Sequence, residues 1–141
     1  MGCDIHIVAE RRKKSGGPWI GVYSTDLMPP WPPHGGRPRC ARRDYDFFAE
    51  IAAVRGSTGT SIHPRNIPED VSDLAWQQYM TAPTDYHSAS YASVKEFCDA
   101  WLRANASKCD GVRPEHIAYD LLGIDTDYRD FEFRLVFWFD N

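Results

Sequence analysis

The stretch Gly-Cys-Asp-Ile-His-Ile-Val-Ala-Glu at residues 2–10 alternates in polarity and predicts a strand near the start of the chain. Because successive side chains of a strand point to opposite faces, the apolar odd-numbered residues suit a core. Asp4, His6 and Glu10 then share the other face. An Asp-x-His pair on a rigid strand can begin a metal site, whereas the simpler alternative is an edge strand whose polar face meets water. The stretch alone favours the simpler alternative.

Residues 129–141 close the chain with the other strong strand pattern. Five large apolar side chains, four of them Phe, alternate there with other residues. This most hydrophobic strand is expected in the centre of a sheet, beside the N-terminal strand. If both strands send apolar residues into one core, their remaining faces form one row. The polar members of that row are Asp4, His6, Glu10, Glu132, Arg134 and Asp140.

The intervening sequence predicts one more strand and four helices. Residues 14–18 have a turn composition, so residues 19–23 return as the second strand of a hairpin. Helices are predicted at 45–54, 72–80, 93–105 and 114–122, from an N-cap at Asp44, a capping box at Ser93 and a first-turn Pro114. The first of these helices is expected to bury Tyr45, Phe48, Ile51 and Ala52. The predicted fold is α+β: a small antiparallel sheet, made of the hairpin and the closing strand, covered on one face by about four helices.

Composition favours a single domain spanning residues 1–141. Hydrophobic residues make up 43% of the chain and aromatic residues 13%, which excludes disorder. No apolar run approaches the ~20 residues that a membrane span needs, and no signal peptide is recognisable, so a cytoplasmic protein is expected. The four cysteines include no Cys-x-x-Cys pair, so neither a zinc knot nor a disulfide framework is predicted.

Charge is unevenly distributed along the chain. Residues 11–43 carry eight Lys or Arg and one acidic residue, whereas residues 44–141 carry eight basic and seventeen acidic residues. A cationic segment on an acidic body argues against binding of long duplex nucleic acid but suits a small phosphate-bearing ligand. For the basic residues 11–14, a solvated hairpin end is the simpler interpretation.

Two further segments contain candidate site residues. Residues 24–43 form a proline-rich loop in which Trp31 either stacks on a ligand or anchors the loop to the core. In residues 84–91, His87 is a candidate metal ligand or general acid-base group that Asp85 could orient. The alternative for this segment is a capped turn.

Four short stretches of the sequence carry a family resemblance. They are residues 2–6, Arg-Asp-Tyr-Asp-Phe-Phe-Ala at 43–49, His-Ser-Ala-Ser at 87–90 and Val-Phe-Trp-Phe-Asp-Asn at 136–141. Together they resemble a family of small, uncharacterised bacteriophage-encoded proteins that open with Gly-Cys-Asp-Ile-His. The family carries no settled activity, so the resemblance implies an origin rather than a reaction. A phage origin implies a role that interferes with host defence, nucleotide signals or nucleic acid, in the cytoplasm of an infected cell.

These observations lead to the hypothesis of a metal-dependent phosphodiesterase acting on a nucleotide, including cyclic or signalling nucleotides. The predicted metal ligands are Asp4, His6, His87 and Asp140, a set that suits Mn²⁺, Zn²⁺ or Fe. Glu10 is the predicted base, His87 a further catalytic group, and Arg134 the cation that neutralises phosphate charge.

Two alternatives belong to other classes of protein. The first is a non-catalytic binder that sequesters a nucleotide, expected as a homo-oligomer. In such a binder, phosphates contact Arg37, Arg39, Arg42 and Arg43, while a base stacks on Trp31, Tyr86 or Trp138. The second is a protein–protein inhibitor whose acidic body mimics nucleic acid.

Overall fold

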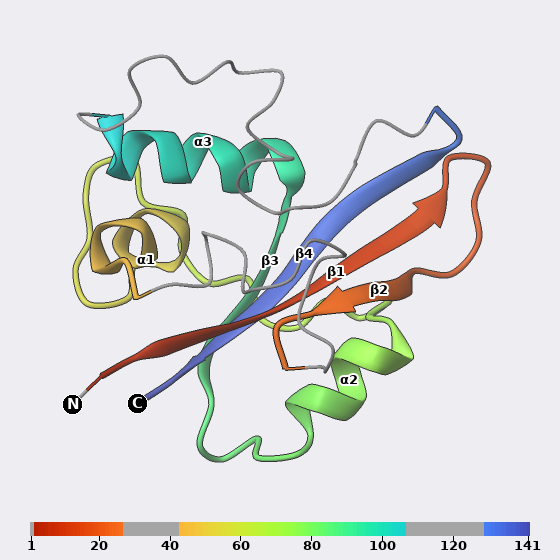
Figure 1. Cartoon of the computed structure of the whole chain (residues 1–141), viewed down its shortest axis with the longest axis horizontal. Helices are drawn as coiled ribbons and strands as arrows, with labels where there is room; N and C mark the ends of the chain where they lie inside the picture. The colour runs from red at the N-terminus through yellow and green to blue at the C-terminus, as the bar shows by residue number, and fades with distance from the viewer. Residues whose placement is uncertain (1, 27–42, 107–128) are drawn as a thin grey trace.

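The computed structural model describes residues 2–26, 43–106 and 129–141. In these residues the chain forms four strands and three helices (Figure 1). In chain order they are β1 (Asp4–Lys13), β2 (Ile20–Ser24), α1 (Tyr45–Ala52), α2 (Asp73–Tyr79), β3 (His87–Ser93), α3 (Val94–Ala104) and β4 (Phe131–Asp140). The class is therefore α+β, as the sequence predicts. The described part of the chain contains no helix with the length and apolarity that a bilayer crossing requires.

The sheet has the strand order β2-β1-β4-β3 and every neighbouring pair is antiparallel. β1 and β4 pair along their whole length, from Asp4 opposite Asp140 to Lys13 opposite Phe131. The two ends of the chain therefore lie side by side (Figure 1). The N-terminal hairpin, the central position of the closing strand and its pairing with the first strand are confirmed.

β3 is the strand that the sequence does not predict. Its sequence, His-Ser-Ala-Ser-Tyr-Ala-Ser, lacks the alternation of large apolar side chains that marks β4. It pairs with β4, and the register shifts between His87 and Ser90. Ser88 lies within this shift in a left-handed conformation with φ of 54°. Small polar residues suit this strand because it forms an edge of the described sheet and is only partly buried.

α1 and α3 cover the face to which β1 and β4 send their odd-numbered residues (Figure 1). Phe48 packs against Phe139 of β4 with ring centroids 5.0 Å apart. Phe47 is also fully buried, because it contacts Phe97 of α3 at 5.0 Å. Tyr45, by contrast, is 37% exposed. The predicted buried stripe of α1 is therefore wrong at Tyr45, because this helix packs against α3 as well as the sheet.

Three helices, rather than about four, are found in the described residues, and they do not share one face of the sheet. The predicted caps at Asp44 and Ser93 are confirmed, and Ser72 also caps its helix, whereas the predicted helix at 114–122 lies outside the described residues. α2 covers the opposite face from α1 and α3 (Figure 1). The expectation that the helices cover one face is therefore wrong.

A second, smaller core explains the position of α2. Val8 and Val136 lie opposite each other on β1 and β4, and Trp138 follows on the same face. All three are fully buried together with Ala75 of α2. This face is polar at both ends but apolar in its middle, so it needs a cover of its own.

A buried ion pair beside the apolar middle of this face joins the sheet to the start of α2. Arg134 Nε donates to Glu10 Oε1 at 2.6 Å, and Arg134 Nη1 donates to Asp70 at 2.8 Å. The other Glu10 oxygen accepts the backbone N–H of Ser72, the N-cap of α2, at 2.6 Å. Glu10 is fully buried, so its charge depends on these donors.

Removal of Arg134 is expected to destabilise the protein strongly. Arg134→Ala leaves the Glu10 carboxylate buried without its cation, which costs about 3–5 kcal/mol of unfolding free energy. Lys95→Ala is the control, since it removes an exposed pair with Asp99 on α3 and is expected to leave the unfolding free energy nearly unchanged. Urea unfolding followed by circular dichroism measures both. A loss below about 1 kcal/mol for Arg134→Ala would show that the pair is dispensable.

Candidate functional site

His6 of β1 lies between two carboxylates at the end of the sheet where the chain termini meet. Its Nδ1 is 2.8 Å from Asp26 and its Nε2 is 2.8 Å from Asp140. Asp140 comes from the paired end of β4. Asp26 lies just after β2. The preceding residue, Thr25, holds this segment in place: its Oγ1 accepts the backbone N–H of Ile7 at 3.0 Å, and its own N–H donates to the Ile7 carbonyl at 3.0 Å.

This arrangement favours the imidazolium form of His6. An ionised carboxylate accepts hydrogen bonds and has none to donate, so both ring nitrogens must carry a proton to satisfy Asp26 and Asp140. Burial by itself lowers the pKa of His6, because it penalises the charged form. The hydrogen bonds to both carboxylates and their negative charges outweigh burial and raise the pKa of His6 above its usual value.

Asp4 and Arg43 extend the same group of charges. Arg43 holds Asp4 in a bidentate ion pair, with Nε–Oδ1 at 2.6 Å and Nη2–Oδ2 at 3.0 Å. The backbone N–H of Asp4 donates to Asp140 at 3.3 Å. Gly2 permits this contact, because a Cβ at that position would collide with the Arg43 guanidinium. We refer to Asp4, His6, Asp26, Arg43 and Asp140 as the His6 cluster.

Aromatic side chains pack against the His6 ring. The His6 ring is stacked on Trp138, with centroids 6.2 Å apart and planes 11° apart. Tyr86 lies 5.1 Å from the His6 ring and 5.8 Å from Trp138. Tyr79 of α2 contacts Trp138 at 5.4 Å. His6 therefore lies in a rigid apolar setting that keeps its side chain 15% exposed.

Besides Trp138, which packs under His6, five of the residues that the sequence suggests lie together in this part of the structure. They are the predicted metal ligands Asp4, His6 and Asp140 and the predicted ligand-binding residues Arg43 and Tyr86. Asp26 was not singled out from the sequence, where it is an isolated acid before a proline-rich loop. Only the return of β2 alongside β1 brings it to His6.

His87 does not join the His6 cluster, so its grouping with the other predicted ligands is wrong. It is paired with Phe139 and its ring stacks on Phe139 at 6.1 Å, on the face that α1 and α3 cover. His6 is paired with Trp138, on the opposite face. The Nδ1 atom of His87 lies 3.0 Å from Ser88 Oγ, and its Nε2 is buried without a hydrogen-bond partner.

The predicted roles of Glu10, Arg134 and Trp138 also need correction. Glu10 lies four residues beyond His6, about 13 Å along the strand, and the buried Val8 and Val136 separate the two. Glu10 and Arg134 neutralise each other in the buried ion pair, so neither is available as a base or a phosphate contact. Trp138 is fully buried and presents no face on which a base could stack.

Trp31, Arg37, Arg39 and Arg42 lie outside the described residues, so their predicted contacts with a ligand stay predictions. Within the described ranges, no three or more His, Cys, Asp or Glu side chains are arranged as a group that could hold a metal ion. In the His6 cluster, protonated His6 and Arg43 offset two of the three carboxylate charges instead.

Comparisons with known proteins add no assignment to this geometry. No family model, no curated protein and no solved structure matches the chain.

The stability of the metal-free protein is expected to depend on pH through His6. The folded state raises the pKa of His6, so protonated His6 stabilises the fold fully below the unfolded value of about 6.5. This contribution is lost as the pH rises through the folded pKa. Urea unfolding at a series of pH values above about 6 in EDTA should show falling stability, and His6→Gln should remove that slope.

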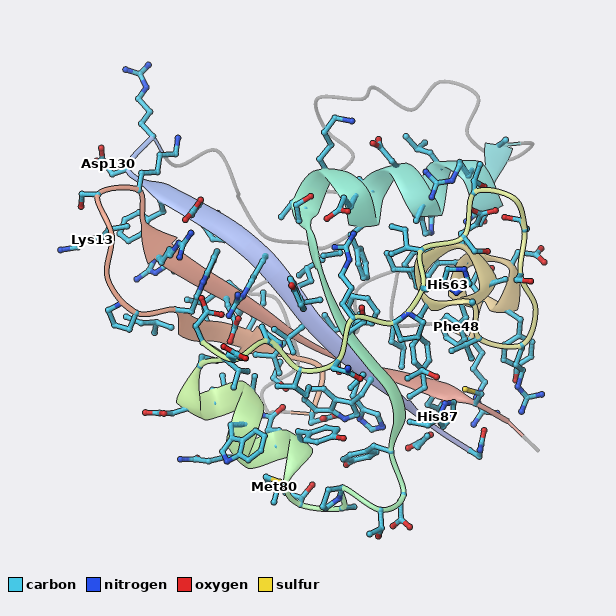
Figure 2. All side chains as sticks on the ribbon, turned by 180° about the vertical axis from the view of Figure 1, so that it is seen from behind. Lys13, Phe48, His63, Met80, His87 and Asp130 are labelled. Carbon is cyan, nitrogen blue, oxygen red and sulfur yellow. The ribbon has the colours of Figure 1, made fainter. Side chains whose placement is uncertain are left out.

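His63→Gln provides the matched control for this experiment. His63 is exposed and lies on the chain between α1 and α2 (Figure 2). Its replacement should leave the pH dependence intact. A slope that persists in His6→Gln would contradict the assignment.

Proposed function

We propose that the His6 cluster binds a divalent metal ion and hydrolyses a phosphodiester bond in a nucleotide, including cyclic or signalling nucleotides. One observation supports this proposal above others: His6 has a carboxylate at each ring nitrogen, with Asp4 next to one of them. Histidines that ligate metals commonly donate their second ring N–H to a carboxylate, which fixes the tautomer and the ring orientation. Asp26 is positioned for that role at Nδ1.

Asp4, His6 Nε2 and Asp140 are then the proposed ligands, and they must rearrange to bind the ion, because no group of three or more His, Cys, Asp or Glu in the described residues is arranged to hold one. One imidazole and two carboxylates suit Mn²⁺, Zn²⁺ or Fe. Nε2 of His6 and Oδ2 of Asp140 are 2.8 Å apart, with the proton of Nε2 between them. This separation is close to the ~3.3 Å between two ligand atoms of a tetrahedral zinc site. That proton must leave before a cation can bind, so the affinity is expected to rise with pH.

The charges of the His6 cluster also favour a cation. Three carboxylates face two positive groups while His6 is protonated, and only Arg43 remains positive once His6 loses its proton. A phosphate group alone would be repelled by this excess of negative charge. When bound, the metal supplies a coordinated water of lowered pKa and polarises the phosphoryl group.

Arg43 is the proposed contact for the phosphate. It is 55% exposed and its guanidinium can hold two phosphate oxygens in the same bidentate way that it holds Asp4. A phosphate that takes over Arg43 after the cation has bound leaves Asp4 free to complete the ligands of the cation. Arg43 also ends the cationic segment that begins at Arg37, so further positive charge lies close in sequence.

A second candidate function is non-catalytic sequestration of the same kind of ligand. One observation favours it: Glu10, the residue expected to act as a base, is buried in an ion pair. If nothing else at the site activates a water molecule, the protein binds a nucleotide and leaves it intact.

Metal titration of the purified protein tests the proposed function. Isothermal titration with Mn²⁺ and Zn²⁺ at about pH 8 should show one bound ion per chain and release of a proton. Each of His6→Gln and Asp140→Asn should weaken binding by about 10-fold or more, whereas His63→Gln should not. Absence of metal binding by the wild-type protein would refute the proposal.

Chromatography of nucleotides separates the two candidate functions. Incubation of the metal-loaded protein with cyclic mononucleotides and dinucleotides should yield products with a free phosphate end. Recovery of the intact nucleotide after heat denaturation, with none free beforehand, would favour sequestration.

A further inference from the structure

A row of aromatic side chains runs from the His6 cluster to the exposed surface of α2. Tyr86 contacts the His6 ring at 5.1 Å, Tyr79 contacts Tyr86 at 5.9 Å, and Trp76 contacts Tyr79 at 6.3 Å. Adjacent rings in the outer part of the row are inclined by 34° and 36°. We refer to Trp76, Tyr79 and Tyr86 as the aromatic row.

Exposure increases along the aromatic row. Tyr86 and Tyr79 are half-buried because they pack on the fully buried Trp138. Thr81 lies 3.3 Å from the Tyr86 hydroxyl, and this contact limits rotation of the ring. Trp76, at the outer end, is 46% exposed.

Trp76 is not needed to attach α2 to the sheet. That attachment uses Ala75, which is fully buried, and Leu74, which occupies the space that Gly21 leaves on β2. Trp76 belongs to neither buried core and instead presents a large flat ring to solvent. An exposed aromatic ring that continues a row from a charged cluster is the arrangement that proteins use to stack a nucleobase.

We propose that the aromatic row is a base-stacking subsite, so that the ligand is a nucleotide or short single strand rather than a phosphate ester without a base. The inference rests on the proposed function for the phosphate end of the ligand. The charged end of such a ligand lies at Arg43 and the His6 cluster, and its base lies on Tyr86, Tyr79 or Trp76. A second base in a dinucleotide would reach the outer ring, Trp76.

Ligands with and without bases test the subsite directly. Adenylyl-(3′,5′)-adenosine and dimethyl phosphate share a phosphodiester, but only the first has bases. Titration calorimetry, with and without Mn²⁺, should show wild-type protein binding the dinucleotide at least about 10-fold more tightly than dimethyl phosphate. Trp76→Ala should remove most of this advantage and leave the affinity for dimethyl phosphate unchanged.

Met80→Ala is the matched control. Met80 lies one helical turn after Trp76, at the end of α2, and is 47% exposed (Figure 2). It has the same exposure but no ring, so its replacement should change dinucleotide affinity by less than about twofold. Trp76→Phe retains a ring and should recover part of the affinity, and circular dichroism checks the fold of each variant.

The outcomes separate this inference from the proposed function. Equal affinity for the two ligands, or no binding of the dinucleotide in either condition, overturns the stacking subsite. Equal losses in Trp76→Ala and Met80→Ala also overturn it, because the effect then belongs to α2 as a whole. Dinucleotide binding that depends on Trp76 without metal binding or turnover supports the subsite while refuting the proposed hydrolysis.

Discussion

The antiparallel pairing of β1 with β4 is the constraint on which the rest of this structure depends. It joins the two ends of the chain over ten positions, with Asp4 opposite Asp140 and Glu10 opposite Arg134. Strand side chains alternate, so a slip of one residue would send the polar residues of β1 into the core beneath α1 and α3. The apolar residues on that face therefore fix the register, and the register brings His6 to Asp140. Stability and the candidate site thus follow from one pairing.

The second face of this pair divides into regions with different roles. In its middle, Val8, Val136 and Trp138 exclude water, and beyond them Glu10 and Arg134 are neutralised within the protein. At the chain termini, the carboxylate of Asp140 is about one-third exposed and His6 remains at the edge of solvent. Both ends of the face carry acids and bases, but the Glu10–Arg134 pair is buried, whereas Asp140 and Arg43 at the terminal end are exposed enough to exchange partners with a ligand. Burial, rather than residue type, separates a structural ion pair from a candidate site.

Sequence alone predicted the elements that local patterns specify. Alternation identified β1 and β4, and the N-cap patterns at Asp44 and Ser93 identified the starts of α1 and α3. β3 was missed because its small polar residues become a strand only through pairing with β4. The position of Asp26 was missed for a similar reason, since it depends on how β2 returns. His87 was misassigned because the register shift at Ser88 places it on the Phe139 face.

Electrostatics sets the order of events at the His6 cluster. Three carboxylates at one end of a sheet would repel one another, so the folded state needs protonated His6 and Arg43 between them. An anionic ligand that drew Arg43 away would leave that repulsion uncompensated. A divalent cation that replaces the His6 proton adds positive charge and makes the later transfer of Arg43 to a phosphate favourable. Under the proposed function, cation binding therefore precedes phosphate binding. The aromatic row carries no charge and lies outside this exchange, so stacking of a base on Trp76 adds affinity without disturbing the balance that holds the chain ends together.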